Sequence, residues 1–432
     1  MTASADRRFG VFTASGLVVA SMIGTGVFTT SGPLLETVGS PAAVLMVWLV
    51  GGVVSLCGAL SYAEIGTTYP EAGGEYAILK HALHPAIGFA AGVVSITAGF
   101  AAPIAVCSLA FSSYLATVVP HLPEIPIAIA LVVATTLLHA QRAAMGTAAQ
   151  NALTVLKIVL VIVLTVVGLF AIDPSRLESA SLASEVARPS FGLGVVQVFF
   201  AYTGWNAAVY VAGDLKEPAR TLPRALLFGT VFVTAIYLAL NATFVLSVPI
   251  EAVRGEVAIA ERVMSALHGP LLAKALAVVI ALGLISTVGA FVLSGTRVYQ
   301  AMALDAPRLA FLGRQRGSDA PATALAIQAG LAIALILTSS LRELLGAVGM
   351  ALSITSALTV IAVFVERRRM ARAGQQPAFK TPGYPFTPLL YLGLLAWVVI
   401  GGSLESPRLL VFSVTTLVVG GLGFFVVRRK TE

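Results

Sequence analysis

The chain has 432 residues, of which 58% are hydrophobic and 11% are charged, and its formal net charge is +7. Soluble globular proteins carry about 25% charged residues, so this composition excludes a soluble protein and indicates an integral membrane protein. The basic residues form no continuous patch with interleaved aromatic residues, which argues against binding to nucleic acid. Cys57 and Cys107 lie inside apolar stretches without a metal-binding or redox spacing, and we expect them to pack in the core.

Twelve apolar stretches follow one another along the chain, centred near residues 18, 53, 102, 133, 161, 202, 236, 284, 331, 355, 394 and 418. About 20 apolar residues suffice to cross a bilayer as a helix. We therefore predict an all-α integral membrane protein with twelve transmembrane helices. The first apolar run is too long for the hydrophobic region of a signal peptide, and we interpret it as the first span.

The distribution of basic residues supports this count. With twelve spans both termini lie on one side, and the loops of that side hold 19 of the 27 lysine and arginine residues, against 6 in the opposite loops. Basic residues concentrate in cytoplasmic loops, so we predict that both termini are cytoplasmic.

Two of the predicted spans contain glycine-rich interruptions. The first span is interrupted at residues 22–28, Met-Ile-Gly-Thr-Gly-Val-Phe, and the sixth at residues 200–206, Phe-Ala-Tyr-Thr-Gly-Trp-Asn. An unpaired backbone group costs several kcal/mol in hydrocarbon, so a broken helix survives only where protein or a water-filled cavity satisfies the freed groups. Paired interruptions in the two halves of a chain are typical of secondary transporters.

The first interruption suits a ligand that carries both charges. Gly24 and Gly26 allow a ligand to approach the main chain, and the half-helix that begins near Thr25 offers amide donors to a carboxylate. Free carbonyls around residues 21–23 favour an ammonium group, so a free α-amino acid fits this arrangement. A small-residue patch for helix packing explains the two glycines equally well.

Several motifs in the sequence belong together. They are Ile-Gly-Thr-Gly-Val-Phe (23–28), Gly-Ser-Pro (39–41), Tyr-Ala-Glu-Ile-Gly (62–66), Glu-Ala-Gly-Gly-Glu-Tyr (71–76), the interruption at 200–206, Asp-Leu-Lys-Glu-Pro-Ala-Arg-Thr-Leu-Pro-Arg (214–224) and Arg-Val-Tyr-Gln-Ala-Met-Ala (297–303). With these motifs the chain resembles the amino acid, polyamine and organocation (APC) transporter superfamily, most strongly over about its first 320 residues. The Gly-Trp-Asn of the sixth span is most similar to the L-type amino acid transporter branch.

The resemblance implies a LeuT-like fold of two inverted five-helix repeats followed by two extra helices. The first repeat would occupy residues 1–171, the second residues 172–366, and the last two spans with the C-terminal tail residues 367–432. The substrate would bind between the broken first and sixth helices.

The resemblance also implies roles for individual residues. Backbone amides of Gly24, Thr25 and Gly26 would bind the substrate carboxylate, and Phe200 would close over the site as a gating aromatic residue. The ammonium group would be bound by carbonyls of Ser21, Ile23, Phe200, Ala201 and Thr203, with Gly204 and Asn206 completing the predicted substrate-binding set.

Lys157 stands in the otherwise apolar run 153–168, about 12 Å from the inner end of its span at 1.5 Å per residue. An ionisable side chain inside the membrane is costly and indicates a functional role by default. In sodium-independent relatives a lysine of the fifth span lies where sodium-coupled members hold a cation. The resemblance therefore implies that the Lys157 ammonium group replaces the ion. Desolvation favours the neutral form of a buried lysine, so the role of a proton carrier is the alternative.

Together these patterns predict a sodium-independent secondary transporter of neutral L-amino acids in the cell membrane, driven by exchange or by protons. A membrane receptor that senses amino acids, or a carrier of polyamines or other organic cations, are the alternatives, and a channel is disfavoured by the lack of charge rings. We expect no enzymatic activity, cofactor or metal, because no catalytic or metal-ligand constellation is visible. The stretch 120–126 lacks the cysteine that joins L-type relatives to a heavy subunit, so we expect a stand-alone, prokaryotic carrier.

Overall fold

The computed structural model describes residues 9–70, 74–140, 147–177, 182–314 and 321–427. Helices account for nearly all of these residues, and the only β-type pairing among them is an isolated bridge between Phe9 and Leu215. The all-α prediction is therefore confirmed for the described part of the chain.

The first half of the chain forms α1 (Val11–Met22), α2 (Gly26–Thr29), α3 (Ser31–Val38), α4 (Pro41–Thr68), α5 (Gly74–Ala82), α6 (Pro85–Val94), the π-helix η1 (Ser95–Ala101), α7 (Ala102–Val118), α8 (Glu124–Ala140) and α9 (Thr147–Leu169). The second half forms η2 (Pro174–Leu177), α10 (Leu182–Val186), α11 (Pro189–Tyr202), η3 (Ala207–Asp214), α12 (Pro218–Leu246), η4 (Ile250–Ala252), α13 (Ile259–His268), α14 (Pro270–Asp305), η5 (Pro307–Gly313), α15 (Ala322–Thr338), α16 (Leu341–Arg372), α17 (Phe386–Glu405) and α18 (Pro407–Val427).

Each of the twelve apolar stretches coincides with a helix. Within the described residues nine helical segments are long and apolar enough to cross a membrane, and three shorter apolar helices cover Glu124–Ala140, Val155–Leu169 and Ala322–Thr338. The count of twelve spans, the inverted repeat and the cytoplasmic termini remain predictions.

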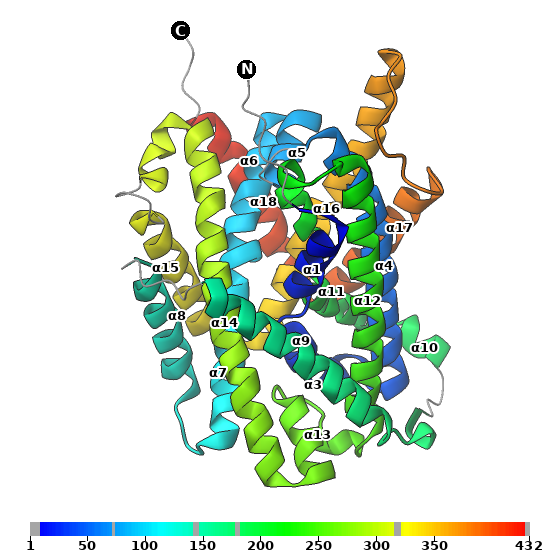
Figure 1. Cartoon of the computed structure of the whole chain (residues 1–432), viewed down its shortest axis with the longest axis vertical. Helices are drawn as coiled ribbons and strands as arrows, with labels where there is room; N and C mark the ends of the chain where they lie inside the picture. The colour runs from blue at the N-terminus through cyan, green and yellow to red at the C-terminus, as the bar shows by residue number, and fades with distance from the viewer. Residues whose placement is uncertain (1–8, 71–73, 141–146, 178–181, 315–320, 428–432) are drawn as a thin grey trace.

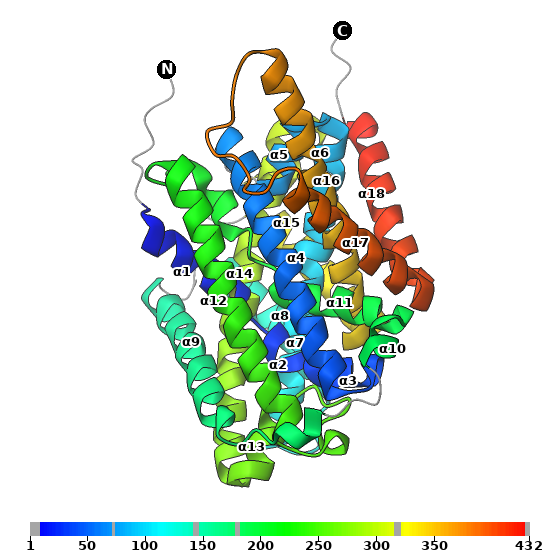
Figure 2. The same ribbon diagram turned by 90° about the vertical axis from the view of Figure 1, so that its right-hand side faces the viewer.

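The helices form one elongated bundle with two distinct ends. Figures 1 and 2 show α5 and the start of α6 at one end, here called the α5 end, and α3 and α13 at the other, the α13 end. Helices α9, α17 and α18 lie on the flanks of this bundle (Figures 1 and 2). Helix α18 exposes Val411, Leu422 and Phe425, as expected of a surface that faces lipid.

Helix starts follow capping rules that are legible in the sequence. Proline opens α4, α6, α11, α12 and α14, where its missing N–H is not needed. The Ser40 hydroxyl accepts a hydrogen bond from the Ala43 amide at 3.1 Å at the start of α4. Ser340 and Glu343 form a reciprocal capping box at the start of α16. These caps fix where the long spans begin.

The third span changes its helical pitch midway. Residues Ser95–Ala101 form a π-helix, and the Ala102 amide bonds to the Thr97 carbonyl five residues back. Pro103 follows directly, and its ring would clash with the carbonyl four residues before it in a regular α-helix. We attribute the wider turn to this proline.

Candidate functional site

The chain leaves helical structure at both predicted interruptions. Residues 23–25 separate α1 from α2, and residues 203–206 separate α11 from η3. Beyond the first interruption, Thr30 keeps helical angles (φ −84°, ψ −37°), so α2 and α3 continue one another. Beyond the second, η3 winds as a 3₁₀ helix with a kink at Val211. Both predicted breaks are therefore present.

The two interruptions lie against each other. A Cβ added to Gly26 would sit 2.5 Å from the Ala201 Cα, and one added to Gly204 would sit 2.7 Å from the Ser21 carbonyl oxygen. Gly204 also adopts φ +97°, which a residue with a side chain rarely tolerates. Glycine at these two positions therefore allows the backbones of the broken spans to touch.

Tyr237 joins the two broken spans. Its hydroxyl lies 2.5 Å from the Met22 carbonyl oxygen at the end of α1 and 3.2 Å from the Ala201 carbonyl oxygen in α11. The Tyr237 ring also packs against Trp48 and Tyr202, with centroids 5.3 Å away in each case. Tyr237 belongs to none of the sequence motifs. The available signal is its type, because a buried phenol in an apolar span needs a polar partner.

The main-chain groups at the first break are only partly satisfied. No backbone carbonyl in the described residues accepts a hydrogen bond from the amides of Gly24, Thr25 or Gly26. The Thr25 carbonyl accepts hydrogen bonds from the Phe28 amide at 3.0 Å and from the Thr29 hydroxyl at 3.1 Å. The Gly24 amide donates to the Tyr237 hydroxyl, so the amides of Thr25 and Gly26 are the donors available where the sequence predicts a carboxylate site.

The carbonyls at the second break are used differently. The Phe200 carbonyl accepts hydrogen bonds from the Thr203 amide at 3.0 Å and from the Thr203 hydroxyl at 2.7 Å. The Ala201 carbonyl faces Tyr237, as described above. Of the five carbonyls predicted to bind the ammonium group, three lie at this break, and two of these, those of Phe200 and Ala201, already have partners in this conformation.

Burial separates the predicted site residues into two groups. Ile23, Thr25, Gly26, Phe200 and Ala201 are buried, whereas Ser21 is exposed and Gly24, Thr203, Gly204 and Asn206 are partly exposed. Phe200 is 4% exposed and belongs to an apolar cluster that includes Cys107 and Val288. Its side chain is therefore packed between helices.

Lys157 lies on the inward side of α9. A Cβ added to Gly283 on α14 would sit 3.9 Å from the Lys157 Cβ, and Lys157 lies near Cys107 on α7. The Cys107 sulfur is 2.6 Å from the Thr25 hydroxyl at the first break. Cys107 thus lies between Lys157 and the first break. Among the described residues, none accepts a hydrogen bond from the Lys157 ammonium group.

A buried carboxyl group adjoins the second break. The Asn206 side-chain amide donates to Glu75 Oε1 at 3.3 Å, and the Tyr62 hydroxyl donates to the same oxygen at 2.6 Å. The Trp205 ring packs edge-on against Tyr62, with centroids 4.6 Å apart. Glu75 and Asn206 thus connect α5 with the interrupted sixth span.

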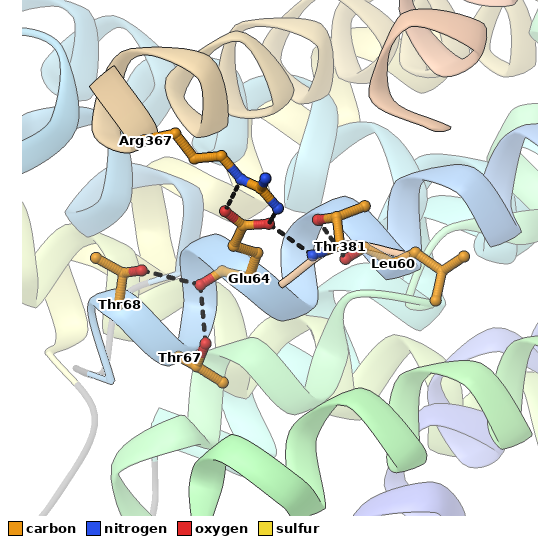
Figure 3. A network of polar contacts seen from close by, with 6 residues as sticks. All are labelled: Leu60, Glu64, Thr67, Thr68, Arg367 and Thr381. Atoms are coloured by element: carbon orange, nitrogen blue, oxygen red, sulfur yellow. Dashed lines mark hydrogen bonds and ion pairs between the residues drawn. The ribbon is translucent and has the colours of Figure 1, made fainter. Parts of the chain in front are cut away.

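A second buried carboxyl group closes the α5 end. Figure 3 shows Glu64 of α4 held by Arg367 of α16 through two contacts of 2.6 and 2.7 Å and by the Thr381 amide at 2.7 Å. The Arg367 guanidinium also lies 3.6 Å from the centroid of the Tyr384 ring. Such bidentate pairing is geometrically specific, and it ties the segment between α16 and α17 to α4.

The surface near this clamp carries a pocket of about 380 Å³, lined among others by Tyr69, Glu366 and Arg369. It lies between the ends of α4, α5 and α16 and contains none of the residues of the two interruptions. We therefore place the candidate site at the interruptions, where the amides of Thr25 and Gly26 lack a backbone partner, and not at this pocket.

The sequence also matches known proteins along almost its whole length. The family described as amino acid permease matches residues 9–422. The chain belongs to the amino acid permease family of the APC superfamily. This membership makes it an amino acid transporter rather than an enzyme, embedded in a membrane as a multi-pass protein.

Individual relatives of this permease agree with that membership. The serine/threonine exchanger SteT of Bacillus subtilis is 30% identical over 393 residues, which cover 89% of this chain and 88% of that protein. The human large neutral amino acids transporter small subunit 2 is 30% identical over 253 residues, or 55% of this chain and 47% of that protein. The rabbit b(0,+)-type amino acid transporter 1 is 28% identical over 252 residues, or 56% and 52%. The predicted L-type relationship is thus confirmed.

Replacing Tyr237 by phenylalanine tests the link between the two broken spans. Removal of the hydroxyl leaves the Met22 and Ala201 carbonyls without this partner, and we expect the permease to lose about 1–3 kcal/mol of stability. Tyr299→Phe is the control, because the Tyr299 hydroxyl is buried without a partner in the described chain. Thermal unfolding of the purified proteins measures the stability of both variants. Equal unfolding temperatures for the two variants would contradict the link.

Proposed function

We propose that this permease transports neutral L-amino acids across the cell membrane without sodium, by alternating access. The observation that carries the proposal is the meeting of two interrupted spans at Gly26 and Ala201, where the amides of Thr25 and Gly26 have no backbone partner among the described residues. Main-chain dipoles of opposite sign a short distance apart favour a small zwitterion, because each charged end finds its own partners. The sodium-independent class and the neutral substrate are parts of this proposal.

In the proposed complex the amides of Gly24, Thr25 and Gly26 bind the substrate carboxylate. Carbonyls of Ser21, Ile23 and Thr203 bind the ammonium group, and those of Phe200 and Ala201 join them when Thr203 and Tyr237 release them. Hydrogen bonds to charged groups are about twice as strong as neutral ones, so a bound ammonium group competes well for these carbonyls. Gly204 and Asn206 border the substrate, and Phe200 gates it.

A neutral substrate follows from the side chains at the second break. Asn206 is the last residue of the second interruption, and its amide donates to the Glu75 carboxyl group. That carboxyl group is further occupied by Tyr62, so a cationic substrate side chain finds no free carboxylate there.

Lys157 takes the role of a fixed cation or proton carrier in the proposed cycle. Lys157 lies near Cys107, which in turn bonds to Thr25 at the first break. A positive charge in this place makes a bound sodium ion unnecessary and repels one. Exchange and proton coupling both remain compatible with this role.

Uptake by proteoliposomes tests the binding site. We expect saturable uptake of neutral L-amino acids, and a loss of at least about tenfold in Gly26→Val, because the added side chain separates the two broken spans. Gly16→Val is the matched control: it lies in the same span, and a Cβ there meets nothing within 4 Å. If Gly26→Val folds as judged by gel filtration and retains full uptake, the substrate does not bind here.

The driving force is tested in the same vesicles. We expect uptake to persist when choline replaces sodium, and to fall at least about tenfold in Lys157→Ala, whereas Lys274→Ala, at an exposed position, retains it. Accumulation driven only by internal amino acid indicates exchange, and accumulation driven by external acid indicates proton symport. A requirement for sodium would contradict the proposed role of Lys157.

A further inference from the structure

Glu75 is a buried acid in a helix that lies between two spans. It is 7% exposed and occupies the first turn of α5, directly after Gly74, which adopts φ +55°. A Cβ added to Gly74 would lie 2.1 Å from the Tyr210 ring of η3, so glycine is required for this close approach. The start of α5 is thus pressed against the half-helix that follows the second break.

The groups around the Glu75 carboxyl are neutral. Tyr62 of α4 and Asn206 donate to Oε1, and Thr355 of α16 faces the same carboxyl group. The other titratable groups that face it are phenols, Tyr210 of η3 and Tyr391 of α17. Among the described residues no lysine, arginine or histidine forms an ion pair with Glu75.

This setting distinguishes Glu75 from Glu64. Arg367 pairs with Glu64 through two contacts and compensates its charge, whereas Glu75 has hydrogen-bond donors alone. Burial raises the pKa of Glu75, and the hydrogen bonds from Tyr62, Thr355 and Asn206 only oppose that rise. An unpaired buried carboxyl group exchanges its proton closer to neutral pH than the ordinary value of about 4.3.

Helix α5 is anchored at its other side. Lys80 Nζ lies 2.7 Å from both carboxylate oxygens of Asp305 at the end of α14, and the Tyr76 hydroxyl donates to the same carboxylate. Glu75 therefore stands on a helix that is fixed to the eighth span, and its side chain reaches the interrupted sixth span. A change in the Glu75–Asn206 bond alters the connection between these two spans.

We propose that Glu75 is a proton-binding site of the transport cycle, at which protonation loosens Asn206 and the half-helix η3 from α5. The proposal rests on the proposed transport function and adds a proton site to it, separate from Lys157. The ionised carboxylate holds Asn206 and Tyr62 by charge-assisted hydrogen bonds. Once the carboxyl group is protonated these bonds weaken to neutral ones, roughly half as strong, and the half-helix moves more easily.

A purely structural acid would behave differently. A carboxyl group that only packs in the core and accepts a hydrogen bond from Asn206 keeps one protonation state while substrate is exchanged. Its replacement by glutamine then changes the stability of the permease but not the pH dependence of exchange. The pH dependence of exchange therefore separates the two roles.

Exchange of a neutral amino acid is measured in proteoliposomes loaded with the same amino acid, with equal pH on both sides and varied between about pH 5 and pH 8. We expect wild-type exchange to become about fivefold faster at acid pH as the bonds to Glu75 lose their charge. Glu75→Gln, which mimics the protonated acid, should exchange at the fast rate at every pH. Glu75→Asp keeps a titratable group and should restore the pH dependence.

Glu366→Gln is the matched control, because Glu366 is also buried at the α5 end but pairs with Arg369 at 3.4 Å. It should keep the wild-type pH profile. A wild-type profile in Glu75→Gln, or a flat profile in the wild-type permease, would overturn the proposal.

Infrared titration of the purified permease gives a readout that needs no transport. As the pH falls toward the ordinary glutamate pKa of about 4.3, the carbonyl stretch of a protonated carboxylic acid should appear in the wild-type spectrum. This band should be missing in Glu75→Gln. If the wild-type permease exchanges no amino acid at all, the proposed function fails, while this band still decides whether Glu75 binds a proton. A spectrum unchanged by Glu75→Gln refutes the proton site.

Discussion

A backbone group that loses its helical partner inside a membrane finds no water to replace it, and this constraint shapes the centre of the permease. The structure meets it by pressing two interrupted spans together. Gly26 and Gly204 remove the side chains that would hold the backbones apart, and the Tyr237 hydroxyl serves one carbonyl from each span. The amides of Thr25 and Gly26 find no backbone carbonyl among the described residues, and in the proposed complex a charged substrate group satisfies them.

Two buried carboxyl groups extend this centre toward the α5 end. Glu75 bonds to Asn206 at the second break, whereas Glu64 is locked to Arg367 and the Thr381 amide. The two acids sit on neighbouring helices but differ in charge compensation, so one suits a permanent clamp and the other a change of protonation. Transport by alternating access needs both kinds of contact, since one part of the bundle must hold still while another moves.

Much of this arrangement follows from the sequence, because it depends on local patterns. Hydropathy locates all twelve apolar helices, and the glycine-rich stretches 22–28 and 200–206 locate both interruptions. Proline and serine mark the helix starts, because both residues are favoured at the beginning of a helix. The family follows from motifs that cluster around these breaks.

Local sequence patterns do not predict the contacts between segments that are far apart in the chain. Tyr237 reads as one aromatic residue in an apolar span, and its partners lie 215 and 36 residues away. Glu64 and Glu75 belong to motifs that give no partner for either acid, yet both are buried against helices far along the chain. The π-helix at Ser95–Ala101 was missed because a proline predicts disruption without specifying its form.

The central claim is that bare main chain at the two breaks recognises both charges of an amino acid. Ligand-induced stabilisation of the purified permease tests it most directly, since a ligand that binds the folded protein raises its unfolding temperature. The comparison uses the neutral L-amino acid taken up fastest, its decarboxylated amine and its deaminated acid, all at one concentration. The account predicts stabilisation by the intact amino acid alone; stabilisation of equal size by the amine or by the acid would contradict it.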